Sequence, residues 1–127
     1  MNKKNKITII IVFFLGIISI YKLNFNNGYK VSILNNTNKN INNLELKYKI
    51  GDKIKTISEI LPKKYWKYTI DTNKIEGENA VILIYKDSNG KLHEEYIIGY
   101  LEKGYSGSVK IIINKVYDNG ELNIEIK

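Results

Sequence analysis

Residues 80–100 decide the fold, and they read AVILIYKDSNGKLHEEYIIGY. The run over 80–86 is rich in Val, Ile, Leu and Tyr, an apolar composition that favours a strand. The turn sequence DSNG at 87–90 follows it, and a second strand-forming run covers 91–100. Asn-Gly is typical of a tight hairpin turn, because both central residues of that turn need positive φ. We therefore predict an antiparallel β-hairpin here.

The number of residues in the loop predicts which positions of the two strands face each other. A tight loop with an even number of residues pairs odd positions with even ones. The pairing places one apolar row beside another, namely Val81, Leu83 and Tyr85 beside Leu92, Tyr96 and Ile98. Glu94 falls on the same face, and the pairing does not explain its charge.

The same signals recur on both sides of this hairpin. A second Asn-Gly pair at 119–120 predicts a hairpin that pairs Val109, Ile111, Ile113 and Tyr117 with Leu122, Ile124 and Ile126. Runs that alternate with period two, or are apolar throughout, predict eight strands in all, over 29–33, 44–50, 53–60, 65–70, 80–86, 91–100, 108–117 and 121–127. Seven to eight short strands without a helix between them indicate an all-β, antiparallel β-sandwich over 29–127, with a small β-barrel as the alternative.

Several local patterns within 31–90 also match a known architecture. They are Val31-x-Ile33, the Asn-Thr-Asn turn, Leu44-x-Leu46-x-Tyr48, Ile60-Leu61-Pro62 before a strand, and the turn that ends at Gly90. About half of the chain thus resembles bacterial immunoglobulin-like surface modules, although the buried Cys pair of antibody-type domains is missing. The resemblance implies an immunoglobulin-like sandwich with an accessory or adhesive binding role outside the cell. It implies no functional residue.

The N-terminal segment has the pattern of an exported protein. Residues 1–6 form a basic flank, and residues 7–21 carry no charge. We predict a signal-anchor transmembrane helix over 7–23 and a linker over 24–28. As a helix, the uncharged run rises only about 22 Å, less than a hydrocarbon core of about 30 Å, so its length also fits a signal peptide.

Two features favour an anchor that stays on the protein. No pair of small residues follows the run to form a cleavage site. The Lys residues of the flank favour the cytoplasm, which places the domain outside the cell membrane. We therefore expect a single-pass membrane protein, with secretion after cleavage as the alternative.

The charge balance argues against nucleic acid as a partner. The net charge is +7, and every one of the 20 basic residues is Lys. Arg, the residue best suited to bidentate phosphate recognition, is absent. The chain also has no Cys, which excludes disulfides, thiolate metal sites and a Cys nucleophile.

Two segments partly resemble catalytic motifs, but neither has the complete pattern. His93 is the only His, so His93-Glu94 lacks the second His of a zinc motif. Gly104-Tyr-Ser-Gly-Ser108 has the wrong spacing for a serine-hydrolase elbow, and we expect a hairpin loop there. No nucleophile, base and orienting group can be assembled, so we expect no enzyme, no cofactor and no metal.

The sequence offers a binding surface instead. Residues 47–67 hold seven Lys against two acidic residues, and Tyr65 with Lys67 is a candidate stacking surface. The candidate residues are Lys47, Lys49, Lys53, Lys55, Tyr65 and Lys67. Such a patch suits an anionic cell-wall component, lipid headgroups or a protein; the alternative is an ordinary solvated face.

These observations together predict a non-catalytic, membrane-anchored, extracytoplasmic binding or accessory module. The alternative is a subunit or immunity-type partner of a membrane complex, in which the N-terminal helix itself makes the contacts.

Overall fold

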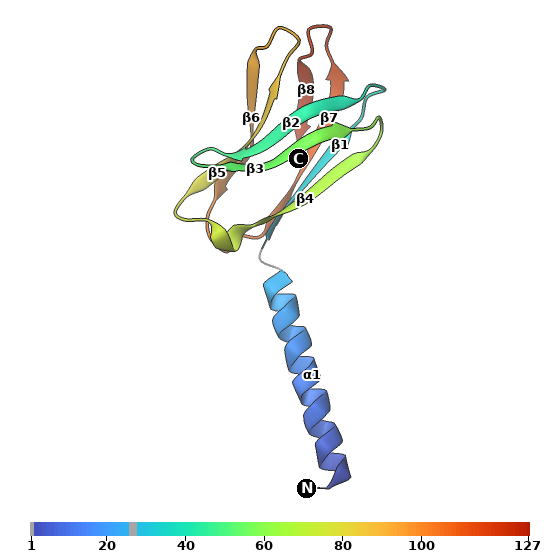
Figure 1. The fold of residues 1–127 in the computed structure, drawn as a ribbon, viewed down its shortest axis with the longest axis vertical. Coiled ribbons are helices and arrows are strands. Elements are labelled where there is room, and N and C mark those ends of the chain that lie inside the picture. Colours follow the sequence, from blue (N-terminus) through green and yellow to red (C-terminus); the bar gives the residue numbers. More distant parts are fainter. Residues whose placement is uncertain (1, 26–27) are drawn as a thin grey trace.

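The computed structural model describes residues 2–25 and 28–127. Helix α1 (Lys3–Phe25) is followed by eight strands and one short 3-10 helix, η1 (Thr72–Lys74) (Figure 1). The helix begins inside the expected basic flank and extends into the expected linker over 24–28. Met1, in that flank, and residues 26–27, in that linker, lie outside the described residues. Within the described residues, no helix has both the length and the apolar character needed to cross a membrane.

The strands form two sheets of four. Their bounds are β1 (Gly28–Asn35), β2 (Ile41–Tyr48), β3 (Lys53–Ile60), β4 (Tyr65–Asp71), β5 (Asn79–Lys86), β6 (Leu92–Leu101), β7 (Gly107–Val116) and β8 (Leu122–Ile126). The first sheet has the order β4-β1-β7-β8 and the second has the order β3-β2-β5-β6. The all-β, two-layered architecture predicted from the alternating runs is therefore confirmed.

The core lies between the two layers. It is built from side chains that alternate along the strands, such as Val31, Ile33, Ile111 and Ile113 of the first sheet and Leu44, Leu46, Val81 and Leu83 of the second. Burial of each such side chain contributes about 1.5–3 kcal/mol. A chain without disulfides depends on this term for its stability.

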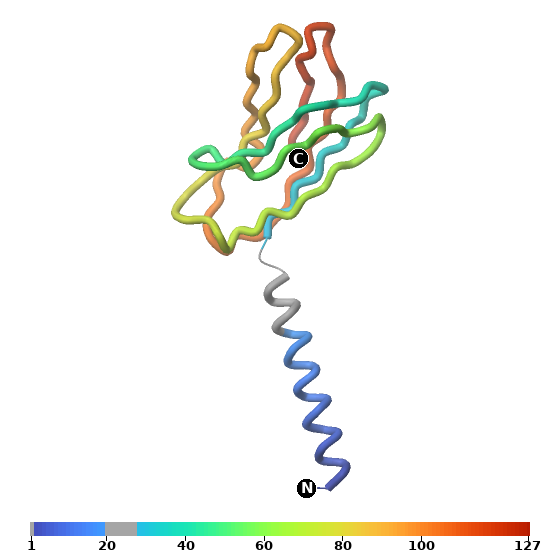
Figure 2. The backbone as a smooth tube through the Cα atoms, in the orientation of Figure 1, coloured from blue at the N-terminus to red at the C-terminus, as the bar shows by residue number. Residues whose placement is uncertain are grey.

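The centre of the first sheet joins distant parts of the chain. Strands β1 and β7 pair in parallel, with Val31 opposite Val109, whereas the other described pairings are antiparallel. Figure 2 shows this as the cyan segment that runs beside the orange-to-red one. The outer face of this sheet therefore combines residues from the beginning, middle and end of the domain.

A buried amide fixes the end of β1. Asn35 is fully buried, and its Nδ2 donates to the carbonyls of Lys39 (2.8 Å) and Ile60 (2.9 Å). Its Oδ1 accepts from the backbone N–H and the hydroxyl of Thr37. Because every polar atom of the side chain has a partner, Asn35 ties the turn after β1 to the end of β3.

The β5–β6 hairpin corrects the predicted register. From Ile82 to Lys86, odd positions pair with odd ones and even with even, as in Tyr85 with His93 and Lys86 with Leu92. The cause is a wider loop over 87–91, in which Asp87 and Lys91 bond through their backbones at 3.0 Å. Glu94 therefore lies opposite Ile84 on the outer face, which removes the mismatch noted in the sequence. A register shift between Val81 and Ile82 then restores the predicted parity and places Val81 opposite Ile98.

The β7–β8 hairpin follows the prediction along most of its length. Ile111 pairs with Ile126 and Ile113 with Ile124. A register shift after Ile113 places Val116, rather than Tyr117, opposite Leu122.

Candidate anion-binding face

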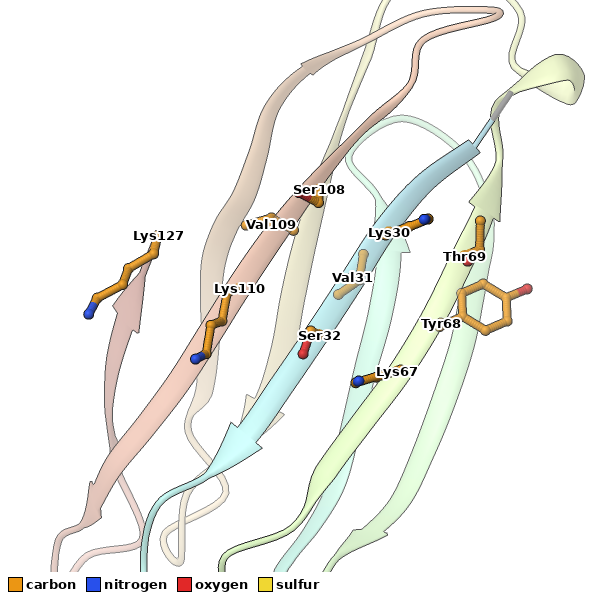
Figure 3. Close-up of a pocket in the computed structure, with 10 residues that line it drawn as sticks. All are labelled: Lys30, Val31, Ser32, Lys67, Tyr68, Thr69, Ser108, Val109, Lys110 and Lys127. Atoms are coloured by element: carbon orange, nitrogen blue, oxygen red, sulfur yellow. The ribbon is translucent and has the colours of Figure 1, made fainter. Parts of the chain in front are cut away.

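The outer face of the first sheet gathers lysines from strands β1, β4 and β7 together with Lys127, the residue that follows β8. On β1, Val31 and Ile33 are buried, so Lys30 and Ser32 point away from the core. The same alternation on the neighbouring strands exposes further polar side chains. We call the resulting surface the lysine face and define it by Lys30, Lys67, Lys110 and Lys127 with Ser32 and Ser108 between them (Figure 3).

The strand registers align these residues in rows. Ser32 lies directly between Lys67 of β4 and Lys110 of β7. Lys110 in turn exchanges two backbone hydrogen bonds with Lys127, at 3.0 and 2.8 Å. One row therefore runs Lys67–Ser32–Lys110–Lys127 across the whole sheet. Lys30 belongs to the next row and lies between Thr69 and Ser108.

An open depression of about 600 Å³ covers the middle of this face. Its shape follows from side-chain length, because short residues such as Ser32 and Ser108 lie between long lysines. The lining thus combines hydroxyl-bearing residues with lysines. None of the described residues that line the depression is an Asp or a Glu.

Three of the four lysines form no ion pair among the described residues, although the charge of Lys110 contributes to lowering the pKa of Glu125. The ion pairs found among the described residues do not involve Lys30, Lys67 or Lys110. Only Lys127 has one, with Glu125 at 3.2 Å. The hydrogen bond from Lys127, followed by one from Asn114, lowers the pKa of Glu125.

Tyr65 holds two of the free ammonium groups. The Nζ atoms of Lys67 and Lys110 lie 5.5 Å and 5.6 Å from the centroid of its ring. Both distances are within the range of a cation–π contact. The half-exposed ring of Tyr65 thus contacts both lysines that flank Ser32.

The second sheet places two of the candidate residues predicted from sequence on its own outer face. Lys47 alternates with the buried Leu46 and lies opposite Lys53. Lys53 forms an ion pair with Glu45 at 3.2 Å. These lysines are therefore separated from Tyr65 and Lys67, which belong to the first sheet.

The remaining two candidates have partners of their own. Lys49 lies 3.9 Å from Glu94 and 5.3 Å from the ring centroid of Tyr96, and the hydrogen bond with Tyr96 raises the pKa of Lys49. Lys55 lies at the edge between the sheets, 5.7 Å from the ring centroid of Tyr68. The structure thus brings Tyr65 and Lys67 together with Lys30, Lys110 and Lys127, and not with the other four candidates.

His93 is engaged in the hairpin loop. Its Nε2 lies 3.0 Å from Asp87 Oδ2, and its ring stacks on that of Tyr85 at 4.8 Å. The bond with His93, together with backbone N–H donors of Asn89 and Lys91, lowers the pKa of Asp87. Within the described part of the chain, no three metal-ligating side chains gather to hold an ion.

Comparison with known proteins adds a fold relationship. No family model matches the chain, and no curated protein matches it. Among solved structures, the chain is similar to a protein from Eubacterium rectale determined by NMR, at 15% identity and a TM-score of 0.50. The match covers 79% of this chain and 88% of that one. Similarity at this level of identity concerns the fold alone.

Proposed function

We propose that this chain is a non-catalytic binding module that takes an anionic ligand on the lysine face. The observation that carries the proposal is the row of Lys67, Ser32 and Lys110, where two ammonium groups flank a hydroxyl without a carboxylate among the lining residues. Like charges held together repel, and a bound anion relieves that repulsion. Lys30 and Lys127 enlarge the same positive field.

The state of the titratable side chains supports binding rather than catalysis. General acid–base chemistry needs a group that can reach the substrate and exchange a proton with it. His93 is mostly buried and is engaged by Asp87 and Tyr85. Its contacts serve the hairpin loop.

We also propose that α1 holds the module on the outer side of the cell membrane. Every described side chain over 2–19 is exposed, and most of those over 7–18 are large and apolar. An apolar surface of this size is normally covered by lipid or protein. Lys3, Lys4 and Lys6 precede it, as expected for a cytoplasmic flank.

We further propose that the two-layered domain is related to immunoglobulin-like modules. This proposal rests on the two layers of four strands and on the sequence patterns within 31–90.

The binding proposal is tested with the full-length chain in a neutral detergent. Titration with dextran sulfate, with uncharged dextran as the reference, measures anion affinity. We expect K30Q/K67Q/K110Q to weaken binding by roughly 10- to 100-fold, about 2- to 5-fold for each lysine. The control K47Q/K49Q/K53Q removes equal charge from the second sheet and leaves most of the affinity. Equal losses in both variants would refute the lysine face as the site.

The location is tested by intact mass and cell fractionation. A full-length mass in the membrane fraction supports the anchor, whereas a mass that begins near residues 22–28 in the medium favours a cleaved, secreted domain. Replacing α1 with an unrelated anchor separates the tethered module from the membrane-complex subunit. Retained function favours the module, and lost function favours contacts made by the helix.

A further inference from the structure

We infer that the ligand of the lysine face is a linear chain of phosphate groups that lies across the strands, with one phosphate over Ser32 between Lys67 and Lys110. This inference rests on the proposed function and specifies its ligand. It follows from the spacing of the charges, from the hydroxyls between them and from the shape of the depression.

The spacing favours a chain over a single small anion. Neighbouring strands lie about 4.8 Å apart, so the backbone positions of Lys67 and Lys110 are separated by about 10 Å and Lys127 lies about 5 Å further on. The charges are thus spread over about 15 Å in one row. A ligand with charges repeated along its length meets several of them at once, and each further contact is effectively intramolecular.

The chemistry of the lining favours phosphate. Ser32 supplies a hydroxyl donor directly between two ammonium donors, and Ser108 and Thr69 supply further hydroxyls beside Lys30. A phosphate group presents several acceptor oxygens in different directions, whereas a carboxylate presents two in one plane. Compact lysine ammonium groups also suit phosphate as point charges.

Tyr65 prepares the position over Ser32. Its ring draws the Nζ atoms of Lys67 and Lys110 to within 5.5–5.6 Å of one centroid. Both lysine side chains that flank Ser32 are thereby partly ordered before any ligand arrives. A phosphate that meets them immobilises less side-chain freedom, which lowers the entropy cost of binding.

Two other anionic partners fit the face less well. Single-stranded nucleic acid needs aromatic rings on which its bases stack. Tyr68 stacks on Trp66 of its own strand, and the exposed ring of Tyr65 already has the Nζ atoms of Lys67 and Lys110 within 5.6 Å of its centroid. A membrane surface favours exposed apolar side chains beside the charges, and the aliphatic residues of the lining, Val31 and Val109, are buried.

The experiment compares phosphate chains of different length. The full-length chain in neutral detergent is titrated with glycerol phosphate, tripolyphosphate, long-chain polyphosphate, polyglutamate and a single-stranded oligonucleotide at one ionic strength. We expect affinity to rise steeply with phosphate chain length and to exceed that for polyglutamate and the oligonucleotide. K67Q/K110Q should weaken binding of the long chain by about 5- to 20-fold, and K30Q/K127Q, on the same face but not beside Ser32, should weaken it less, by about 4-fold.

The variant S32A adds a test of the phosphate position. We expect a loss of about 2- to 5-fold with little change in the melting temperature, because only one partly exposed hydroxyl is removed. If long-chain polyphosphate bound no more tightly per molecule than polyglutamate, the oligonucleotide or tripolyphosphate, the inference would be overturned. The anion-binding proposal would remain intact. If binding of every anion were insensitive to all lysine-face variants, the proposed function itself would fail.

Discussion

The outer faces of the two sheets carry the same basic residue but differ in its partners. On the second sheet, Lys53 is paired with Glu45 and Lys49 with Glu94. On the first sheet, Lys30, Lys67 and Lys110 have no carboxylate partner among the described ion pairs. The number of lysines therefore does not distinguish a binding surface from a solvated one; the placement of the acidic residues does.

This difference has a simple physical basis. A surface ion pair neutralises its own lysine and contributes only about 0–1 kcal/mol to stability. Unpaired lysines that share one face raise the local potential and attract anions from a distance. The second sheet thus pairs two of its lysines with acidic residues, although Lys47 and Lys55 take part in none of the described ion pairs. The first sheet leaves Lys30, Lys67 and Lys110 available to a ligand.

The largest expected effect comes from making the first sheet resemble the second. In S32E, a carboxylate lies between Lys67 and Lys110 and neutralises the centre of the row. We expect polyphosphate affinity to fall by about 100-fold, because two attractive contacts are lost and one repulsive contact is gained. Isothermal titration calorimetry of the full-length chain measures the change.

A matched variant on the other sheet controls for charge alone. S58E places the same carboxylate on β3, at an exposed position of the second sheet. It should reduce affinity by less than about 3-fold, through long-range repulsion that salt screens. An equal loss in S58E and S32E would show that net charge, and not the row, governs binding.

The converse change should convert the second sheet into a weak binding surface. E45Q/E94Q frees Lys53 and Lys49 without altering their positions. We expect this effect in a chain that also carries K30Q/K67Q/K110Q, which removes the unpaired lysines of the first sheet. Polyphosphate affinity should rise by about 5-fold, and the free energy of unfolding should change by less than about 1 kcal/mol. Affinity that does not change would mean that the unpaired lysines are insufficient without a hydroxyl between them.

The architecture could be predicted from sequence because its signals are local. Alternation and Asn-Gly turns located all eight strands and most of the β7–β8 register. The predicted β5–β6 register was wrong from Ile82 to Lys86 because Asp87, which bonds the backbone N–H groups of Asn89 and Lys91, widens the loop. That bonding depends on the folded loop and is not visible in a count of loop residues.

The candidate site could be predicted only in part. Lys47 to Lys67 were grouped because they are near in sequence, yet the chain passes from the second sheet to the first between β3 and β4. Lys30 and Lys110 occupy outward positions of predicted strands, so their exposure was predictable. Their proximity was not, since the parallel pairing of β1 with β7 joins segments that no local pattern connects.

A smaller effect is expected from the aromatic ring that holds the lysines. Y65L removes the cation–π contacts to Lys67 and Lys110, each of which contributes about 0.5–1 kcal/mol at an exposed site. The freed lysine side chains become less ordered, and we expect polyphosphate affinity to fall by about 3-fold. Y65F, which keeps the ring, should bind normally, and Y96L, which removes the ring beside Lys49, is the control on the second sheet. A loss in Y65F equal to that in Y65L would assign the effect to the hydroxyl instead.

The smallest effect concerns the one paired lysine of the lysine face. Glu125 neutralises Lys127, and this contact holds the pKa of Glu125 below its ordinary value of 4.5. As pH falls through that lowered pKa, Glu125 takes up a proton, Lys127 is released and the face gains a free charge. Polyphosphate, whose internal phosphates stay ionised, should then bind about 2-fold more tightly.

Folding stability should respond to the same protonation with the opposite sign. A carboxylate whose pKa is lower in the folded than in the unfolded chain stabilises the protein above the unfolded pKa, and this contribution disappears as pH falls through the folded pKa. Acidification should therefore strengthen binding while it weakens the contribution of Glu125 to stability. E125Q should bind polyphosphate at neutral pH as tightly as the parent chain does in acid. Its affinity should not rise when the pH falls through the pKa of Glu125. If E125Q and the parent chain changed in parallel with pH, the step would belong to another group, and Lys127 would not contribute to the row.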